Sequence, residues 1–198
     1  AINLSAGAGS VYGTGTTKNT SVVATDNTDT TQKVVARVPG TAGNSIAVSE
    51  TSNHLSWGGS TLGGGVNAET VSINGRAYSF VTVLSEINGA DAIADQVLFG
   101  SDSSVALDNL KLAVNAEGTA GSSYSTGTIK NADVLATTNE SNAQTFEALV
   151  SGSAGNAITT TTTIVNGSFG GATLSGGSDA TAAEFIAAIV TTINAITG

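Results

Sequence analysis

The stretch Gly40-Thr-Ala-Gly-Asn44 returns later in the chain as Gly152-Ser-Ala-Gly-Asn156, at an offset of 112 residues. The same offset aligns residues 3–68 with residues 115–180 without a gap, and 31 of the 66 aligned positions are identical. A match of this length in one ungapped register is very improbable by chance, even in a chain rich in Gly and Thr. Because self-similarity at a fixed spacing marks a repeated structural unit, we predict an internal duplication.

The two copies share the pattern of short β-strands between flexible turns. Segments rich in Val and Thr suit a pleated surface, and the Gly and Asn clusters between them supply turns with positive φ. Trp57 and Phe169 occupy equivalent positions, each followed by Gly-Gly, and we interpret them as the aromatic anchors of two cores. The predicted strands are 21–25, 32–38, 45–51, 129–137, 144–150 and 157–165.

A β-hairpin is predicted between the two copies. Residues 70–74 and 76–83 alternate apolar and polar side chains around Asn74-Gly75, the pair that favours a type I′ turn. This hairpin has no counterpart after the second copy. It is therefore either the opening hairpin of the second module or an insertion between the modules.

Two segments carry the apolar spacing of a helix. The first spans 103–116, with cap oxygens in Ser101-Asp102-Ser103 and a stripe at Leu107, Leu110 and Val114. The second spans 180–196 and aligns with the first at an offset of 79, ending in the same apolar-Asn pair. Its stripe is wide and β-branched, so packing rather than helix propensity must stabilise it.

The C-terminal helix raises a question of partnership. The first copy begins where a preceding helix would end, so our hypothesis is that helix 180–196 completes the first module. It would do so either within one chain or on a neighbouring subunit, and the alternative is a helix packed on its own module. The residues singled out for packing or assembly are Trp57, Phe169, Phe185, Ile186, Ile189 and Ile193.

These patterns predict an α+β fold that is mainly β, with two similar β-rich modules, each with one helix. The predicted organisation is a first module at 1–68 that is a partial copy, a hairpin and connector at 69–100, a second module at 101–180 with helix 103–116, and a C-terminal helix at 181–198. The sequence leaves open whether Ala1 follows removal of Met or cleavage of a leader.

Composition argues against several classes of chemistry. The chain has 15 acidic and 6 basic residues, a net charge of −9, a single His and no Cys. Scattered basic residues in an acidic chain do not form the patch that grips phosphate backbones, and no apolar run has the length of a transmembrane helix. His54 has Asn166 as its counterpart and no motif that supplies a nucleophile. We therefore predict no enzymatic activity, no catalytic, cofactor or metal site, no specific nucleic-acid binding and no membrane insertion.

Four strings combine turn glycines with apolar anchors: Gly40-Thr-Ala-Gly-Asn-Ser-Ile46, Trp57-Gly-Gly-Ser-Thr-Leu-Gly-Gly64, Val71-Ser-Ile-Asn-Gly-Arg-Ala-Tyr-Ser-Phe80 and Ser104-Val-Ala-Leu-Asp-Asn-Leu110. They resemble modules repeated in virion proteins of tailed bacteriophages and prophages, in the order hairpin, helix, strand and turn. The order is complete once, from about residue 69 to residue 180, and the first copy lacks hairpin and helix. The resemblance implies a structural role on the tail or on the head surface.

Low charge, β-rich repeats and thin cores favour a self-assembling structural protein whose apolar patches are covered by neighbours. The expected partners are copies of the same chain, as a homo-oligomer with a head-to-tail arrangement among the options, and other virion proteins. The expected location is the virion, as part of the tail or as capsid decoration. The alternative is a secreted bacterial or archaeal filament, surface-layer or adhesin subunit, located outside the cell or on its surface.

Overall fold

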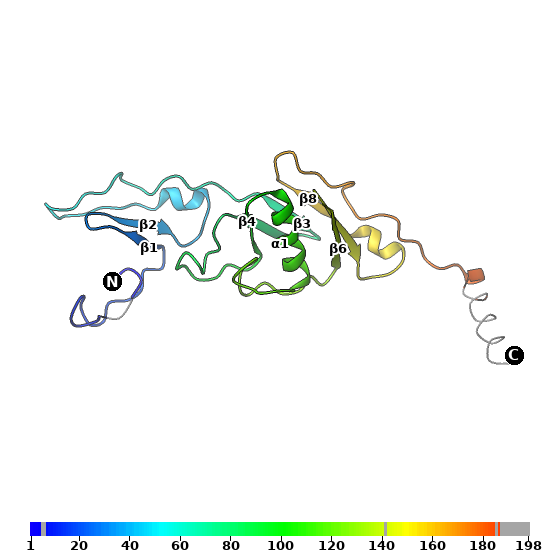
Figure 1. Ribbon diagram of the computed structural model, residues 1–198, viewed down its shortest axis with the longest axis horizontal. Helices are drawn as coiled ribbons and strands as arrows, with labels where there is room; N and C mark the ends of the chain where they lie inside the picture. Colours follow the sequence, from blue (N-terminus) through cyan, green and yellow to red (C-terminus); the bar gives the residue numbers. More distant parts are fainter. Residues whose placement is uncertain (5–6, 141, 185, 187–198) are drawn as a thin grey trace.

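The computed structural model of the chain describes residues 1–4, 7–140, 142–184 and 186 (Figure 1). Within these residues the protein contains small sheets, the helix α1, two 3-10 helices, η1 and η2, and the short helical stretch 182–184. The predicted class, α+β and mainly β, is confirmed. The elements form an elongated body, with the N-terminus toward one end and residues 182–184 at the other (Figure 1).

A four-stranded sheet lies at the centre, in the order β5-β4-β3-β8. Strands β3 (Thr70–Ile73) and β4 (Arg76–Val81) form an antiparallel hairpin through Asn74 and Gly75, whose φ angles are both positive, at 49° and 81°. The predicted Asn-Gly hairpin is therefore confirmed, because a type I′ turn needs positive φ at both positions.

The hairpin belongs to the same sheet as the end of the second copy. The free edge of β3 pairs antiparallel with β8 (Thr160–Thr162), and β4 pairs in parallel with β5 (Gln96–Leu98). We therefore describe residues 69–180 together as the central region, and residues 1–68 as the N-terminal region.

Helix α1 spans Ser103–Asn115, close to the predicted bounds. Its first turn is capped by Asp102, whose carboxylate accepts hydrogen bonds from the N–H groups of Ser104 and Val105 at 3.0 and 3.1 Å. These two N–H groups have no partner within the helix, which is why an Asp at this position stabilises it. The bond from Val105, together with those from the Ser101 hydroxyl and from Ser104, holds the pKa of the Asp102 carboxyl below its usual value.

The main core lies where α1 packs on β5 and on the hairpin of β6 (Val134–Glu140) and β7 (Ala143–Ala148). The buried apolar side chains there come from the hairpin of β3 and β4, from β5, α1 and β6, and from two positions outside these elements, Tyr124 and Ile158. They are Val71, Ile73, Tyr78, Phe80, Val97, Ala106, Leu110, Ala113, Val114, Tyr124, Val134, Ala136 and Ile158.

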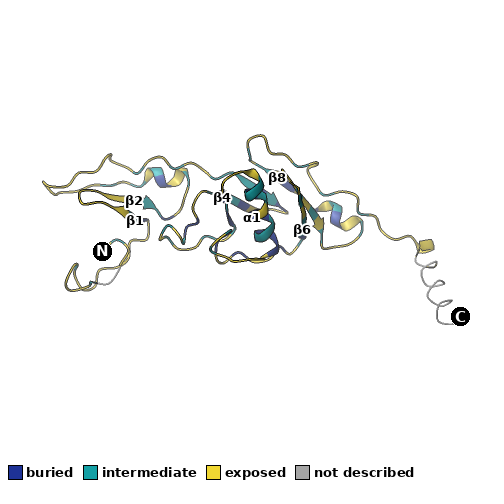
Figure 2. Ribbon diagram, in the orientation of Figure 1, coloured by how far each residue is buried: buried dark blue, intermediate teal, exposed yellow. Residues whose placement is uncertain are grey.

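The N-terminal region repeats part of this arrangement. It contains a hairpin of β1 (Val22–Asn27) and β2 (Gln32–Ala36), followed by η1 (Thr41–Ser45), as β6 and β7 are followed by η2 (Ser153–Ala157). In Figure 2 this region is mainly exposed or half-buried, whereas buried residues gather around α1.

Two features differ from the sequence predictions. The strand predicted at 45–51 is wrong, because this segment carries only a single bridge, between Ala47 and Thr61. Its counterpart in the second copy becomes β8 because β3 lies beside it and supplies hydrogen-bond partners. Strand β5 was not predicted, since three residues are too short to show a period.

Candidate functional site

Asparagine side chains hold equivalent backbone positions in the two copies. The amide of Asn115 donates to the carbonyl of Ala136 and accepts from its N–H, both at 2.9 Å. The amide of Asn3 does the same with Ala24, at 2.6 and 2.9 Å. Each Asn therefore fastens the start of its copy to the first strand of its hairpin, β1 for Asn3 and β6 for Asn115.

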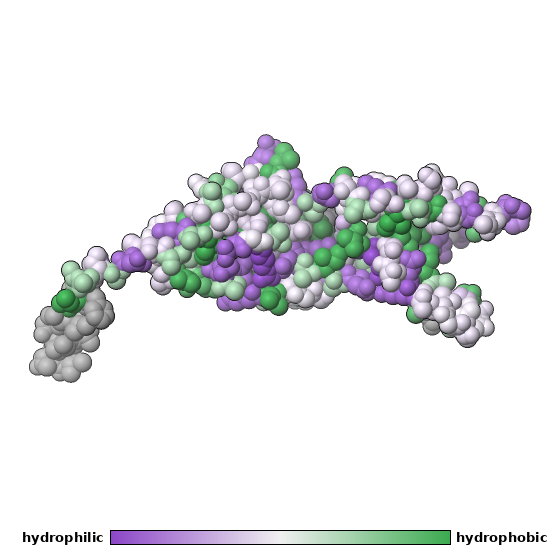
Figure 3. Space-filling view, turned by 180° about the vertical axis from the view of Figure 1, so that it is seen from behind, coloured by the Kyte–Doolittle hydropathy of each residue, from purple (hydrophilic) through white to green (hydrophobic). Residues whose placement is uncertain are grey.

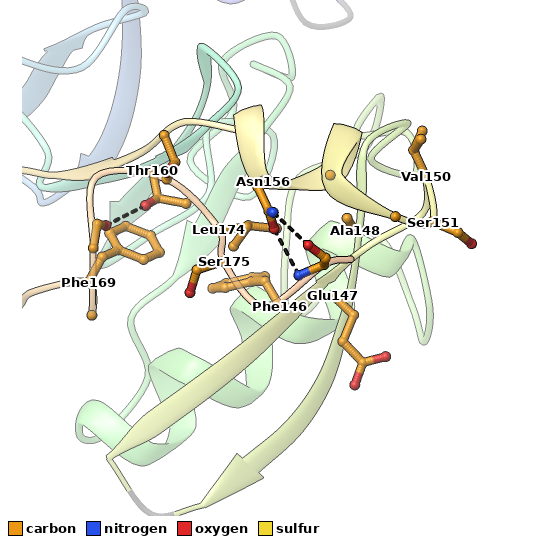
Figure 4. Close-up of a pocket in the computed structure, with 16 residues that line it drawn as sticks. Phe146, Glu147, Ala148, Val150, Ser151, Asn156, Thr160, Phe169, Leu174 and Ser175 are labelled. Carbon is orange, nitrogen blue, oxygen red and sulfur yellow. Dashed lines mark hydrogen bonds between the residues drawn. The ribbon is translucent and has the colours of Figure 1, made fainter. Parts of the chain in front are cut away.

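A second asparagine clamp also recurs. Figure 4 shows the side chain of Asn156 bridging the backbone of Gly177, with bonds of 2.8 and 2.9 Å. Asn44 makes the same pair of bonds to Gly65, both at 2.8 Å. Glycine is required at both partners, because an added Cβ would collide with the carbonyl oxygen of the Gly that precedes each 3-10 helix.

These paired contacts support the predicted duplication, which remains a prediction. The left-handed residues also correspond, since Leu4 and Ala116 have φ angles of 53° and 50°. The bulge in β1 lies between Ala24 and Asn27, and that in β6 lies between Ala136 and Asn139. The shared sequence thus specifies shared backbone geometry.

The two copies differ in what covers them. In the central region α1 packs on β6 and β7, and Asn115 is only 7% exposed. In the N-terminal region the contacts of β1 with other described elements are mainly with β2, and the equivalent Asn3 is exposed. The described residues place no helix on β1 where α1 lies on β6.

The uncovered surface is apolar. We define the open face by Ala24, Val34 and Trp57, the counterparts of Ala136, Phe146 and Phe169. Ala24 and Val34 are half-buried and Trp57 is 38% exposed.

The counterparts of these residues lie in the core or pack against it. Ala136 is buried, and Phe169 is half-buried, packs on the core and lies 6.1 Å from the ring of Phe146. Leu55 and Val66 near Trp57 in the sequence are also strongly exposed, at 70% and 79%. An open apolar face of this kind is typical of a contact surface.

The two regions meet along a groove of about 620 Å³. Its N-terminal side comes from β2, η1 and residues 62–68, and its central side includes Phe80, Val83 and Phe99. Figure 3, which views the molecule from behind, shows hydrophobic residues gathered on and beside the junction of the two regions. A smaller hollow of about 450 Å³, lined by Phe146, Leu174 and neighbours, repeats the N-terminal side of this groove on the central region (Figure 4).

Charged side chains also join the regions. Lys18 donates to Asp91 at 2.8 Å, and the buried Arg37 lies 3.4 Å from the same carboxylate. The hydrogen bond and charge of Lys18, with a smaller contribution from Arg37, lower the pKa of Asp91 below its usual value. These partners lie far apart in the sequence and no local pattern marks them.

The predicted packing residues at the C-terminus fall partly within the structure. Ile186 is 59% exposed, whereas Phe185, Ile189 and Ile193 lie outside the described residues. The helical residues 182–184 begin with a reciprocal cap, in which the N–H of Thr181 donates to Glu184 at 2.7 Å and the N–H of Glu184 donates to the Thr181 hydroxyl at 3.2 Å. The two bonds from Thr181 lower the pKa of Glu184.

The residues considered for chemistry lie apart. His54 is exposed, and Asp26 pairs with Lys33 at 3.5 Å. Among the described residues, no three His, Cys, Asp or Glu side chains gather closely enough to hold a metal ion. In the same part of the chain no helix has both the length and the apolar character needed to cross a membrane.

Comparisons of the chain with protein-family models, with curated proteins and with solved structures found no match.

Proposed function

We propose that the chain is a non-enzymatic, self-assembling structural subunit of a tailed-phage virion, in the tail tube, associated with the tail or decorating the capsid. The observation that carries the self-assembly is the open face of the N-terminal region. Its apolar residues correspond to Ala136, which is buried, and to Phe146 and Phe169, which pack against the core. Burying such a face against a neighbour removes apolar surface from water and stabilises the assembly.

The virion role rests on the resemblance of the four sequence strings to phage structural modules. An elongated subunit with an apolar contact surface suits a tube or a shell, where each subunit is covered by the next (Figure 1). The net charge of −9 supports the same proposal, because an acidic surface does not bind DNA that passes along it.

Self-assembly is tested with the 198-residue chain by light scattering after size exclusion, over a wide concentration range, followed by electron microscopy. The expected result is a mass that rises with concentration and particles of regular shape such as rings or tubes. A monomer at every concentration would contradict the proposal.

The virion role needs a separate test, which is the coding locus. Flanking genes for tail or capsid proteins are the expected finding. A secretory leader encoded before Ala1 would contradict the virion role and favour the secreted filament, surface-layer or adhesin subunit instead.

A further inference from the structure

The strongest unexplained feature is the contrast between a covered and an uncovered hairpin. Helix α1 lies on β6 and β7 and buries Leu110 and Val114. The equivalent hairpin of β1 and β2 keeps the same clamp, through Asn3, without a helix on it among the described residues. A segment able to cover this hairpin in the same way would carry the apolar stripe of α1.

One segment of the chain has the start of such a helix. Thr181 caps residues 182–184 and corresponds at the offset of 79 to Asp102, the residue that caps α1. The cap at Thr181 is seen in the structure, whereas the offset of 79 comes from aligning the apolar residues that follow each cap. Both observations match the same residues of the two segments.

The apolar stripe continues the correspondence. Ile186 and Ile189 occupy the positions of Leu107 and Leu110, which contact the core from α1. Residues 182–192 therefore present the spacing of residues 103–113. The equivalence stops there on the open face, because Asn3 already holds the position that Asn115 holds at the end of α1.

The geometry favours a second copy as the source of this helix. The helical residues 182–184 lie at the opposite end of the elongated molecule from β1 and β2 (Figure 1). Ile186, which would face a core in the equivalent position, is 59% exposed. Within one chain the described residues 182–184 thus lie away from the face that residues 182–192 match in sequence.

We propose that residues 182–192 of one copy dock as a helix on the open face of a second copy, as α1 lies on β6 and β7. The helix position is then shared by two chains, with residues 182–192 from one and Ile2-Asn3 from the other. This inference rests on the self-assembly part of the proposed function and specifies its contact.

The proposed contact can be located to a residue pair. In the central region Asn139 donates to the carboxylate of Asp108 at 2.6 Å. The two offsets map these residues to Asn27 on β1 and to Ala187 in the docking segment. Ala187 of one copy should therefore lie beside Asn27 of the next.

The experiment is disulfide trapping in the full chain, which has no Cys of its own. Two single variants, Asn27→Cys with an affinity tag and Ala187→Cys without one, are mixed in oxidised glutathione. The matched control mixes Ala187→Cys with tagged Asn139→Cys, whose position α1 already covers. We expect at least about tenfold more mixed dimer from the first mixture, because docking raises the effective concentration of the two thiols.

Equal yields in the two mixtures would overturn the inference. So would a double variant, Asn27→Cys with Ala187→Cys, that forms only a disulfide within one chain. Light scattering of the unmodified chain separates the two proposals. If the unmodified chain assembles but the Cys variants form no specific disulfide, the docking mode fails and self-assembly stands. If the unmodified chain stays monomeric and the Cys variants form no disulfide, both proposals fail.

A second pair of variants tests the apolar stripe. Ile186→Asp places a charge where Leu107 contacts the core, and should weaken association at least about tenfold. Ala187→Asp adds the same charge one residue later, where α1 itself carries Asp108, and should keep or strengthen association, because the new carboxylate would meet Asn27 as Asp108 meets Asn139. Equal loss in both variants would contradict docking by this face. The emission of Trp57, the single Trp, should shift to shorter wavelength on association only where Ile186 is intact.

Discussion

The N-terminal and central regions contain one hairpin design in two settings. Both close with the same asparagine clamps, the same bulge and the same glycine contacts. Among the described residues, only the central hairpin has a helix packed on it and shares a core with a four-stranded sheet. The comparison teaches that the short motifs determine backbone geometry, whereas burial depends on what lies beside them.

The largest expected difference concerns the apolar side chains. Leu110→Ala removes a core residue that is 1% exposed and should lower the free energy of unfolding by about 2–5 kcal/mol. Leu55→Ala, at a position that is 70% exposed, should change it by less than about 0.5 kcal/mol. Urea unfolding followed by circular dichroism measures both. Similar losses would show that the N-terminal region has a core of its own.

The asparagine clamps give a sharper test, because the bonds are the same and only the burial differs. Asn115→Ala leaves the buried backbone of Ala136 without partners and should cost about 1–3 kcal/mol. Asn3→Ala should cost less than about 1 kcal/mol, since water can replace the exposed amide. Hydrogen exchange at the N–H groups of Ala136 and Ala24 reads each clamp separately. Equal effects would break the comparison.

The helix cap is expected to contribute less. Asp102→Ala should lower the free energy of unfolding by less than Leu110→Ala does, because two N–H groups of α1 lose their acceptor. The lowered pKa of Asp102 means that its contribution is present above the ordinary carboxyl pKa and is lost as the pH falls through the lowered value. Unfolding measured from pH 7 to pH 2 checks this. Asp102→Asn keeps an acceptor and should remove this part of the pH dependence.

The smallest expected effect separates two otherwise equivalent loops. Ser153 bonds through its N–H and hydroxyl to Asp179, and these bonds lower the pKa of Asp179. Thr41 makes the same contacts to Asn67, which does not titrate. On acidification the contact of Ser153 should weaken as the pH falls through the lowered pKa of Asp179, while that of Thr41 persists.

Amide chemical shifts of Ser153 and Thr41, followed by NMR from pH 7 to pH 2, measure the two loops in one sample. Asn67→Asp should transfer the pH response to the N-terminal loop. A response of equal size at Thr41 in the unmodified chain would contradict the assignment to Asp179.

Local patterns were sufficient to predict the hairpin at Asn74-Gly75 and the helix α1. Each is determined by residues close in sequence, since positive φ at 74 and 75 and the cap at Asp102 need no distant partner. The strand predicted at 45–51 is wrong because strand formation there depends on a distant partner. Its counterpart β8 pairs with β3, which lies far away in the chain, and the first copy has no such neighbour in the described residues.

The candidate site was predicted in part. The equivalence of Trp57 and Phe169 is visible in the sequence, but their different surroundings are not, because these depend on where α1 packs. The contact of Arg37 with Asp91 could not be found from spacing either. Long-range pairing determined both outcomes.

The separation between Thr181 and the open face has a consequence for kinetics (Figure 1). A subunit that donates a helix at one end and receives one at the other joins a growing polymer in a single orientation. Under the proposed docking, Ile186→Asp still receives a helix from a neighbour but donates a poor one. Small amounts of it mixed with the unmodified protein would therefore act as a chain terminator and shorten the polymers in proportion to the dose.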